Sequence, residues 1–201
     1  MDENLAKIRH DRSVKDFPDL RLEEDEYVEF AFRRANVCLM LIIFGVGLGL
    51  IVVLLAFLLV LLGQSMIDET GRNFLYIILS SLLAATAIIG LVALKVHNGN
   101  RLFITNKHAI QMVMDSPMVH SINIIDLSSI EDASFRQDSI KQHLFRYGTF
   151  RLSTIGDETT YTFKYSDISG AELKAITDLI SKAKKRHKKK IAKAAEDEEE
   201  N

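Results

Sequence analysis

The sequence predicts a membrane α-helical hairpin joined to a mostly β (α+β) domain, a barrel or sandwich that is capped by a C-terminal helix. Three observations predict this class. Two long runs, residues 37–62 and 74–94, contain no charged residue. After Arg101, short stretches alternate apolar and polar residues, which is the period of half-buried strands. An amphipathic stretch with a clear helix start follows Ser169.

Four segments follow from this pattern. We expect residues 1–35 to be a cytoplasmic N-terminal segment, 36–96 the transmembrane hairpin, 97–187 the mostly β domain and 188–201 a charged tail. The 201 residues carry a net charge of −2, so the distribution of charge is more informative than its sum. The single cysteine, Cys38, cannot form an internal disulfide, so the domain needs no oxidising compartment.

Both uncharged runs are long enough to cross a bilayer. A hydrocarbon core of roughly 30 Å needs about 20 helical residues, and residues 37–62 and 74–94 meet this length. A helix in a soluble core is rarely apolar on all sides over such a length. A cleaved signal peptide is not expected, because a long segment with many charges precedes the first run.

The basic residues that flank the runs predict the orientation. Lysine and arginine gather before the first run and after the second, whereas Arg72 is the single one between the runs, near Asp68 and Glu69. Basic residues stay on the cytoplasmic side. We therefore expect a multi-pass protein of the cell (plasma) membrane with both termini in the cytoplasm. Phe74 and Tyr76 fit the outer interface.

Small residues predict where the two helices pack. In each run they lie four positions apart, which lets helix backbones approach closely in lipid. These residues are Gly45, Gly49, Ser80, Ala84, Ser81 and Ala85. The same face would also suit dimerisation. Because the runs lack charge at membrane depth, we interpret the hairpin as an anchor rather than a conduit.

The segment after the hairpin predicts short antiparallel strands and one helix. The strands are expected at residues 110–114, 118–125, 130–136, 150–154 and 160–165, with turns at 115–117 and 156–158. The helix begins with a capping box of Ser169 and Glu172 and a hydrophobic staple of Ile168 and Leu173. Its apolar stripe, expected to lie on the sheet, is Leu173, Ile176, Leu179, Ile180 and Ala183.

Three stretches of this domain carry fold motifs. Leu102–Asn106 ends a strand in Thr-Asn before Lys107, Ile125–Ile130 reads Ile-Asp-Leu-Ser-Ser-Ile, and Tyr147–Thr149 is a Tyr-Gly-Thr strand start. Together they resemble the bacterial pleckstrin-homology-like (PH-like) domain of membrane-anchored proteins. That family also has a short F-P…E-x-V stretch before the membrane, and similar residues here are Phe17, Pro18, Glu26 and Val28.

The resemblance covers most of the chain, from Phe17 to Ala183. It implies a two-helix membrane anchor and a PH-like domain capped by a C-terminal helix. His108 departs from the pattern, because the family often has arginine there. The motifs describe a fold, so they imply no activity.

No motif in the sequence predicts catalysis or a metal. HExxH, a cysteine pair, a P-loop and GxSxG are all absent, and no two of the six histidines are four residues apart. We therefore expect no enzyme activity, no cofactor, no catalytic residue and no metal site. Nucleic acid is not an expected partner, because the tethered chain has a net charge near zero.

Two surfaces are candidates for contact with lipid or protein. The first is Phe145-Arg146-Tyr147. In the alternative interpretation, the rings of Phe145 and Tyr147 fill the domain, and Gly148 supplies a bulge or a positive-φ turn before a strand. The second is a basic cluster near the C-terminus, either a solvated helix end or a group attracted to the anionic inner leaflet by about 1 kcal/mol per residue. The cluster comprises Lys182, Lys184, Lys185, Arg186, Lys188, Lys189 and Lys190, and acidic residues 196–200 compete with it.

The expected function is a non-catalytic, membrane-anchored interaction or scaffold module at the cytoplasmic face. It would bind the bilayer through the hairpin, and a protein partner or a second copy through its domain. Two alternatives are open. The domain could recognise anionic lipid headgroups, or the chain could be an accessory subunit of an envelope or transport complex.

Overall fold

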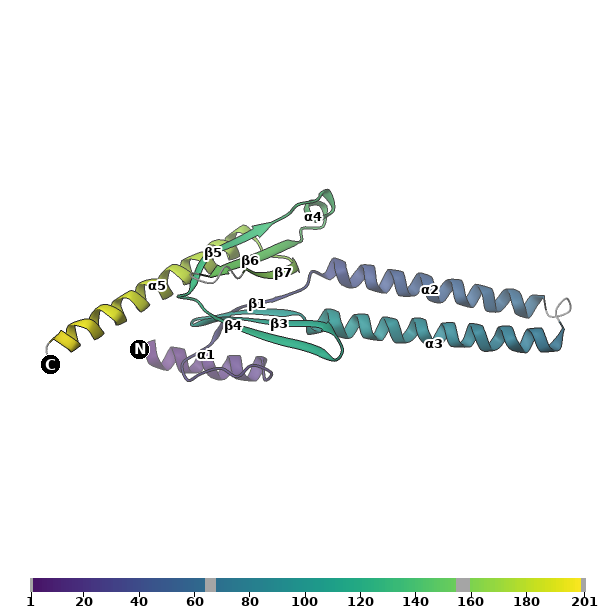
Figure 1. The fold of residues 1–201 in the computed structure, drawn as a ribbon, viewed down its shortest axis with the longest axis horizontal. Coiled ribbons are helices and arrows are strands. Elements are labelled where there is room, and N and C mark those ends of the chain that lie inside the picture. Colours follow the sequence, from purple (N-terminus) through teal and green to yellow (C-terminus); the bar gives the residue numbers. More distant parts are fainter. Residues whose placement is uncertain (1, 64–67, 155–159, 200–201) are drawn as a thin grey trace. The chain divides into compact units, whose positions relative to one another are not determined.

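The computed structural model describes residues 2–63, 68–154 and 160–199, which divide into two compact units (Figure 1). The hairpin unit comprises Asn36–Gly99 and Met114–His120. The sheet unit comprises Met1–Ala35, Asn100–Val113 and Ser121–Asn201.

Two long helices dominate the hairpin unit. Helix α2 is Asn36–Leu62 and helix α3 is Glu69–Gly99. By length and composition both could cross a membrane, and only 6% of the most apolar 18 residues of each are buried. The start and end of α2 agree with the predicted run. Helix α3 extends beyond the predicted 74–94 at both ends, because helical hydrogen bonding continues into the polar flanks.

The seam between α2 and α3 differs from the predicted one. Gly49 lies against Thr86, and a Cβ added to Gly90 would be 2.9 Å from Val46 Cγ1. Gly45 has no neighbouring atom within 4 Å of the place where its Cβ would be. The predicted small residues of α3 are exposed: Ser80, Ser81, Ala84 and Ala85. The stripe of α3 that faces α2 recurs every three to four residues, and these residues lie outside it.

In the described residues, the sheet unit contains seven strands and three helices, except that the end of β3 and the start of β4 fall within Met114–His120 of the hairpin unit. The first sheet has the order β1-β2-β3-β4 and the second has the order β5-β6-β7. The strands are β1 (Val28–Arg33), β2 (Arg101–Thr105), β3 (His108–Ser116), β4 (Val119–Asp126), β5 (Ile130–Arg136), β6 (Gly148–Thr154) and β7 (Thr160–Ser166). The helices are α1 (Asp2–Asp16), α4 (Ile140–Leu144) and α5 (Gly170–Glu199). This α+β arrangement is consistent with the PH-like architecture that the resemblance implies.

The five predicted strands are present, with small differences at their ends. Strand β3 continues through Asp115 and Ser116, so the turn narrows to Pro117 and Met118. The predicted turn at 156–158 lies outside the described residues. The capping box of α5 is confirmed: Ser169 N–H donates to Glu172 Oε2 at 2.8 Å, and Glu172 N–H donates to Ser169 Oγ at 3.2 Å.

The first 35 residues belong to the sheet unit and are not the separate segment that the sequence predicts. Strand β1 pairs antiparallel with β2, and Phe32 lies opposite Leu102. The domain therefore begins before the hairpin and is not confined to 97–187. The alternation of Phe30 and Phe32 is the local signal for this strand. Its partner, β2, follows the whole hairpin in the sequence, so no local pattern predicts the pairing.

Both faces of β2 and of the first half of β3 are buried, whereas β4 is mostly exposed. One core joins the two sheets and α5, and it includes Leu102, Ile104, Ile130, Phe150, Leu152, Ile176 and Ile180. The predicted apolar stripe of α5 is confirmed by this core. A second cluster covers the other face, where Phe103 contacts Leu20 and meets the ring of Phe17 edge-on at 5.1 Å. The N-terminal segment thus completes the fold by covering a sheet face.

Candidate functional site

The turn between β2 and β3 binds the segment that precedes β1 through hydrogen bonds and an ion pair. We call this set of contacts, made by Asn106 and Lys107, the Thr-Asn-Lys clamp. Asn106 Oδ1 accepts a hydrogen bond from Tyr27 N–H at 3.0 Å, and its Nδ2 donates to Asp25 O at 2.9 Å. Lys107 Nζ lies 3.1 Å from Glu23 Oε2. The Thr-Asn-Lys motif therefore joins two segments that are separated in sequence by the entire hairpin. From the sequence alone, this motif indicates only the fold.

A buried carboxylate lies behind this turn. Glu26 is 2% exposed. Its Oε1 accepts from Thr105 Oγ1 at 2.6 Å and lies 2.8 Å from His108 Nδ1, while its Oε2 accepts from Glu23 N–H at 3.0 Å. Burial acts to raise the pKa of Glu26, but the hydrogen bonds from Thr105, Glu23 and His108 together lower it below its ordinary value. His108 therefore contacts a buried acid.

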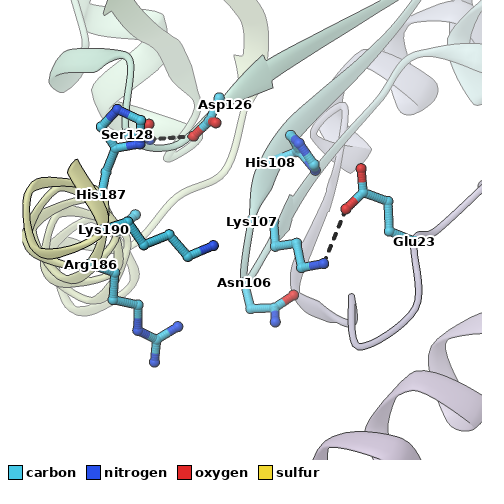
Figure 2. A pocket seen from close by; sticks show the side chains of 10 residues that line it. Glu23, Asn106, Lys107, His108, Asp126, Ser128, Arg186, His187 and Lys190 are labelled. Atoms are coloured by element: carbon cyan, nitrogen blue, oxygen red, sulfur yellow. Dashed lines mark hydrogen bonds and ion pairs between the residues drawn. The ribbon is translucent and has the colours of Figure 1, made fainter. Parts of the chain in front are cut away.

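A pocket of about 430 Å³ opens beside the clamp (Figure 2). Its walls come from the β2–β3 turn, the loop after β4, and α5. Figure 2 shows Lys190 extending from α5 toward the turn that carries Lys107, with Arg186 and His187 on the same helix. Arg186 and Lys190 belong to the basic cluster that the sequence predicts, whereas no local pattern places Lys107 beside them. Only the folded turn brings these cations together.

The pocket carries cations that are available to an anionic group. Its two carboxylates are already engaged, because Glu23 pairs with Lys107 and Asp126 accepts from Ser128 N–H at 2.7 Å. Within the part of the chain that the structure describes, no salt bridge involves Arg186 or Lys190. Their guanidinium and ammonium groups can therefore bind a carboxylate or phosphate.

The structure divides the predicted basic cluster among different surfaces of α5. A second pocket, of about 570 Å³, is lined by Lys184, Lys185 and Lys188 together with Ile191. Lys184 Nζ also donates to Glu131 O at 3.2 Å. Two further predicted residues, Lys182 and Lys189, are exposed and line neither pocket. They provide a matched control for the others.

The Phe145-Arg146-Tyr147 surface lies elsewhere in the sheet unit. Phe145 is 50% exposed, so its ring does not fill the domain as one alternative expected. The half-buried Tyr147 ring lies 5.9 Å from the Tyr165 ring. The backbone role of Gly148 is confirmed: the pairing register of β6 with β7 shifts there, and an added Cβ would lie 2.7 Å from the Phe135 ring.

These two candidate surfaces lie at opposite ends of β5. Lys184 contacts Glu131 near the start of the strand, whereas Gly148 lies against Arg136 at its end. Arg136 is five positions along the strand from Glu131, which is about 17 Å at roughly 3.3 Å per residue. Figure 1 shows α4 beyond one end of β5 and the C-terminal half of α5 extending from the other.

Ala35, the residue before α2, lies at the end of the sheet unit that contains Gly148. Ala35 N–H donates to Tyr165 O at 2.6 Å. Arg34 forms an isolated antiparallel β-bridge with Ser166, and Ser166 pairs with Gly148 across β6 and β7. Strand β1 runs toward this end, and β2 runs away from it to the Thr-Asn-Lys turn. The basic pocket is therefore at the end of the sheet unit that is distal to Ala35.

No protein-family model and no curated protein matches this chain. Among solved structures, the chain is similar to a DUF1696 family protein with a pleckstrin-homology domain from Shewanella loihica PV-4, with 12% identity. The match covers 42% of this chain and 70% of that chain, with a TM-score of 0.31. A similarity of this size carries no information about ligands or partners.

Proposed function

We propose that this chain is a non-catalytic, membrane-anchored interaction module. Helices α2 and α3 cross the cell membrane as a hairpin, both termini lie in the cytoplasm, and the sheet unit is a PH-like domain. The exposure of the apolar helices supports the anchor, because a helix of a soluble core would be mostly buried and these are not. The basic residues that flank the hairpin support the orientation.

The domain binds an acidic segment of a protein partner at the basic pocket. The observation that carries this choice is the position of the pocket, at the end of the sheet unit distal to Ala35. A leaflet contact would be favoured at the proximal end, where the chain leaves for α2. A distal basic pocket is instead accessible to a partner approaching from the cytoplasm. Arg186 and Lys190 would pair with its carboxylates.

Binding of an acidic peptide tests this assignment. The full chain in nanodiscs of neutral lipid should bind a fluorescent hexaglutamate peptide, and this binding should weaken as salt rises. In the double variant Arg186→Glu/Lys190→Glu we expect about tenfold weaker binding, because both unpaired cations of the pocket are reversed. Lys182→Glu/Lys189→Glu makes the same change in net charge outside both pockets and should bind nearly as wild type.

Equal losses in the two double variants would show that general charge, and not the pocket, attracts the peptide. If the wild-type chain ignored the peptide but Arg186→Glu/Lys190→Glu lost binding to anionic vesicles, the lipid-recognition alternative would replace this proposal. Capture of a transport or envelope complex through the hairpin, unaffected by either double variant, would favour the accessory-subunit alternative.

Cysteine labelling tests the orientation of the anchor. In a Cys38→Ser background, Glu69→Cys should react with an impermeant maleimide added to intact cells, because it lies between the two spans. Asp178→Cys, on the exposed surface of α5, should react only after the membrane is permeabilised. The reverse pattern would place the sheet unit outside the cell and refute the proposed orientation.

A further inference from the structure

We infer that α4 and Phe145 form a membrane-seated tip, in which the side chains of Ile140, Leu144 and Phe145 enter the headgroup region of the bilayer that holds α2 and α3. Lys141 and Arg146 contact anionic lipid beside them. The inference rests on the proposed function in one respect, namely that the hairpin spans the bilayer. It adds a second attachment of the sheet unit to that bilayer.

Three large apolar side chains of the tip are exposed together. Ile140 is 88% exposed, Leu144 is 73% exposed and Phe145 is 50% exposed. Residues four apart share one face of a helical turn, so Ile140 and Leu144 form one apolar edge, and Phe145 adjoins it. A contiguous apolar patch on a soluble surface usually marks a site of contact with protein or membrane.

The tip is held in shape by its own hydrogen bonds. Ser139 and Gln142 form a capping box at the start of α4. At its end, Tyr147 N–H donates to Gln142 O at 3.0 Å. Arg146 between them adopts a left-handed φ of 53°, a conformation that a non-glycine residue keeps only where its surroundings impose it. The exposed apolar side chains therefore belong to an ordered turn.

The charges of the tip match an anionic leaflet. Residues 139–147 contain Lys141, His143 and Arg146 and no acidic residue. The nearest carboxylate, Asp138, already pairs with Arg136 at 3.5 Å. An apolar edge with basic residues beside it is the pattern of segments that lie in the membrane interface, with their apolar side chains roughly 5–10 Å deep.

Contacts within the sheet unit link the tip to the start of the anchor. The Tyr147 ring adjoins the Tyr165 ring, and Tyr165 O accepts the hydrogen bond from Ala35 N–H. The Arg34 guanidinium lies over the Tyr165 ring, 5.7 Å from its centroid. Because α2 begins at Asn36, one residue after Ala35, the tip lies near the end of the sheet unit from which the chain continues into α2. This continuity favours lipid over a protein partner as the occupant.

Tryptophan fluorescence tests the inference, because the chain contains no tryptophan of its own. Three single variants of the full chain are placed in vesicles of phosphatidylcholine and phosphatidylserine. Phe145→Trp reports the tip, Leu58→Trp reports the exposed surface of α2, and Ile191→Trp reports the exposed distal part of α5. Replacing part of the phosphatidylcholine with lipid brominated near the headgroup end of its acyl chains should reduce Phe145→Trp emission about twofold. It should leave Ile191→Trp unchanged.

The outcomes separate the tip from the anchor. If Leu58→Trp is quenched but Phe145→Trp behaves as Ile191→Trp does, the tip inference fails while the anchor stands. If Leu58→Trp is not quenched, the hairpin does not span the bilayer and the proposed function fails. Quenching of Ile191→Trp as strong as that of Phe145→Trp would also overturn the inference, because the contact would then not be specific to the tip. Adding Lys141→Glu and Arg146→Glu should weaken the quenching of Phe145→Trp, and unchanged quenching would overturn the assigned role of these cations.

Discussion

Replacing Gly148 with alanine is expected to destabilise the sheet unit by about 3 kcal/mol, the upper range for overpacking a core position. An added Cβ would overlap Arg136 O and lie 2.7 Å from Phe135 Cζ. The first of these neighbours is backbone of the paired strand β5, so no side-chain rotation relieves the overlap. Strands β5 and β6 must separate at the end where α4 joins them.

Gly170→Ala is the matched control for this change. Gly170 begins α5, and no neighbouring atom lies within 4 Å of its Cβ position. The stability of this variant should stay within about 0.5 kcal/mol of wild type. Thermal unfolding of the detergent-solubilised chain can be followed by near-UV circular dichroism of tyrosine, because Tyr27, Tyr147, Tyr161 and Tyr165 all lie in the sheet unit. Equal melting temperatures for the two variants would contradict the close approach at Gly148.

Replacing Glu26 with alanine is expected to cost about 3–5 kcal/mol, the usual effect of removing one partner from a buried charged network. The change leaves the Thr105 hydroxyl, the Glu23 N–H and His108 Nδ1 without the carboxylate that they contact. Thr105 is itself fully buried, so water does not replace the lost acceptor, and as a donor its hydroxyl keeps only the longer contact to His108 O at 3.0 Å. The Thr-Asn-Lys clamp should loosen, and β1 should lose its fixed start.

A partly exposed acid three residues away provides the control. Glu29 pairs with Arg9 at 3.4 Å at the surface, so Glu29→Ala should cost less than about 1 kcal/mol. The same tyrosine signal measures both variants. In addition, Thr105→Val should cost less in the Glu26→Ala background than in wild type, because the shorter of the two hydrogen bonds that the Thr105 hydroxyl donates is already gone. Additive effects would show that these two residues do not act as one network.

Local patterns in the sequence were sufficient to predict most of the elements. The uncharged runs correspond to α2 and α3, and the alternating stretches correspond to strands. The capping box of Ser169 and Glu172 marks the start of α5, as predicted. Each of these signals involves residues a few positions apart, so it can be read without knowing the fold. The exposed aromatic-basic turn at Phe145 and the basic cluster on α5 were also found this way.

The arrangement of these elements depended on contacts between distant segments. Strand β1 pairs with β2 across the whole hairpin, and the face that α3 presents to α2 is not the one marked by its small residues. The clamp on Tyr27, the network of Glu26 and the pocket that adds Lys107 to Arg186 and Lys190 all join segments far apart in the chain.

The sequence by itself therefore determined which segments are helices and strands and which surfaces carry charge, because these follow from periodicity and composition within short windows. The tertiary structure alone decided that Phe145 and the lysines of α5 lie at opposite ends of the sheet unit, and which of these ends is linked to α2. The physical reason is that strand direction and pairing register, set by long-range hydrogen bonds and a shared core, fix where each local feature is presented.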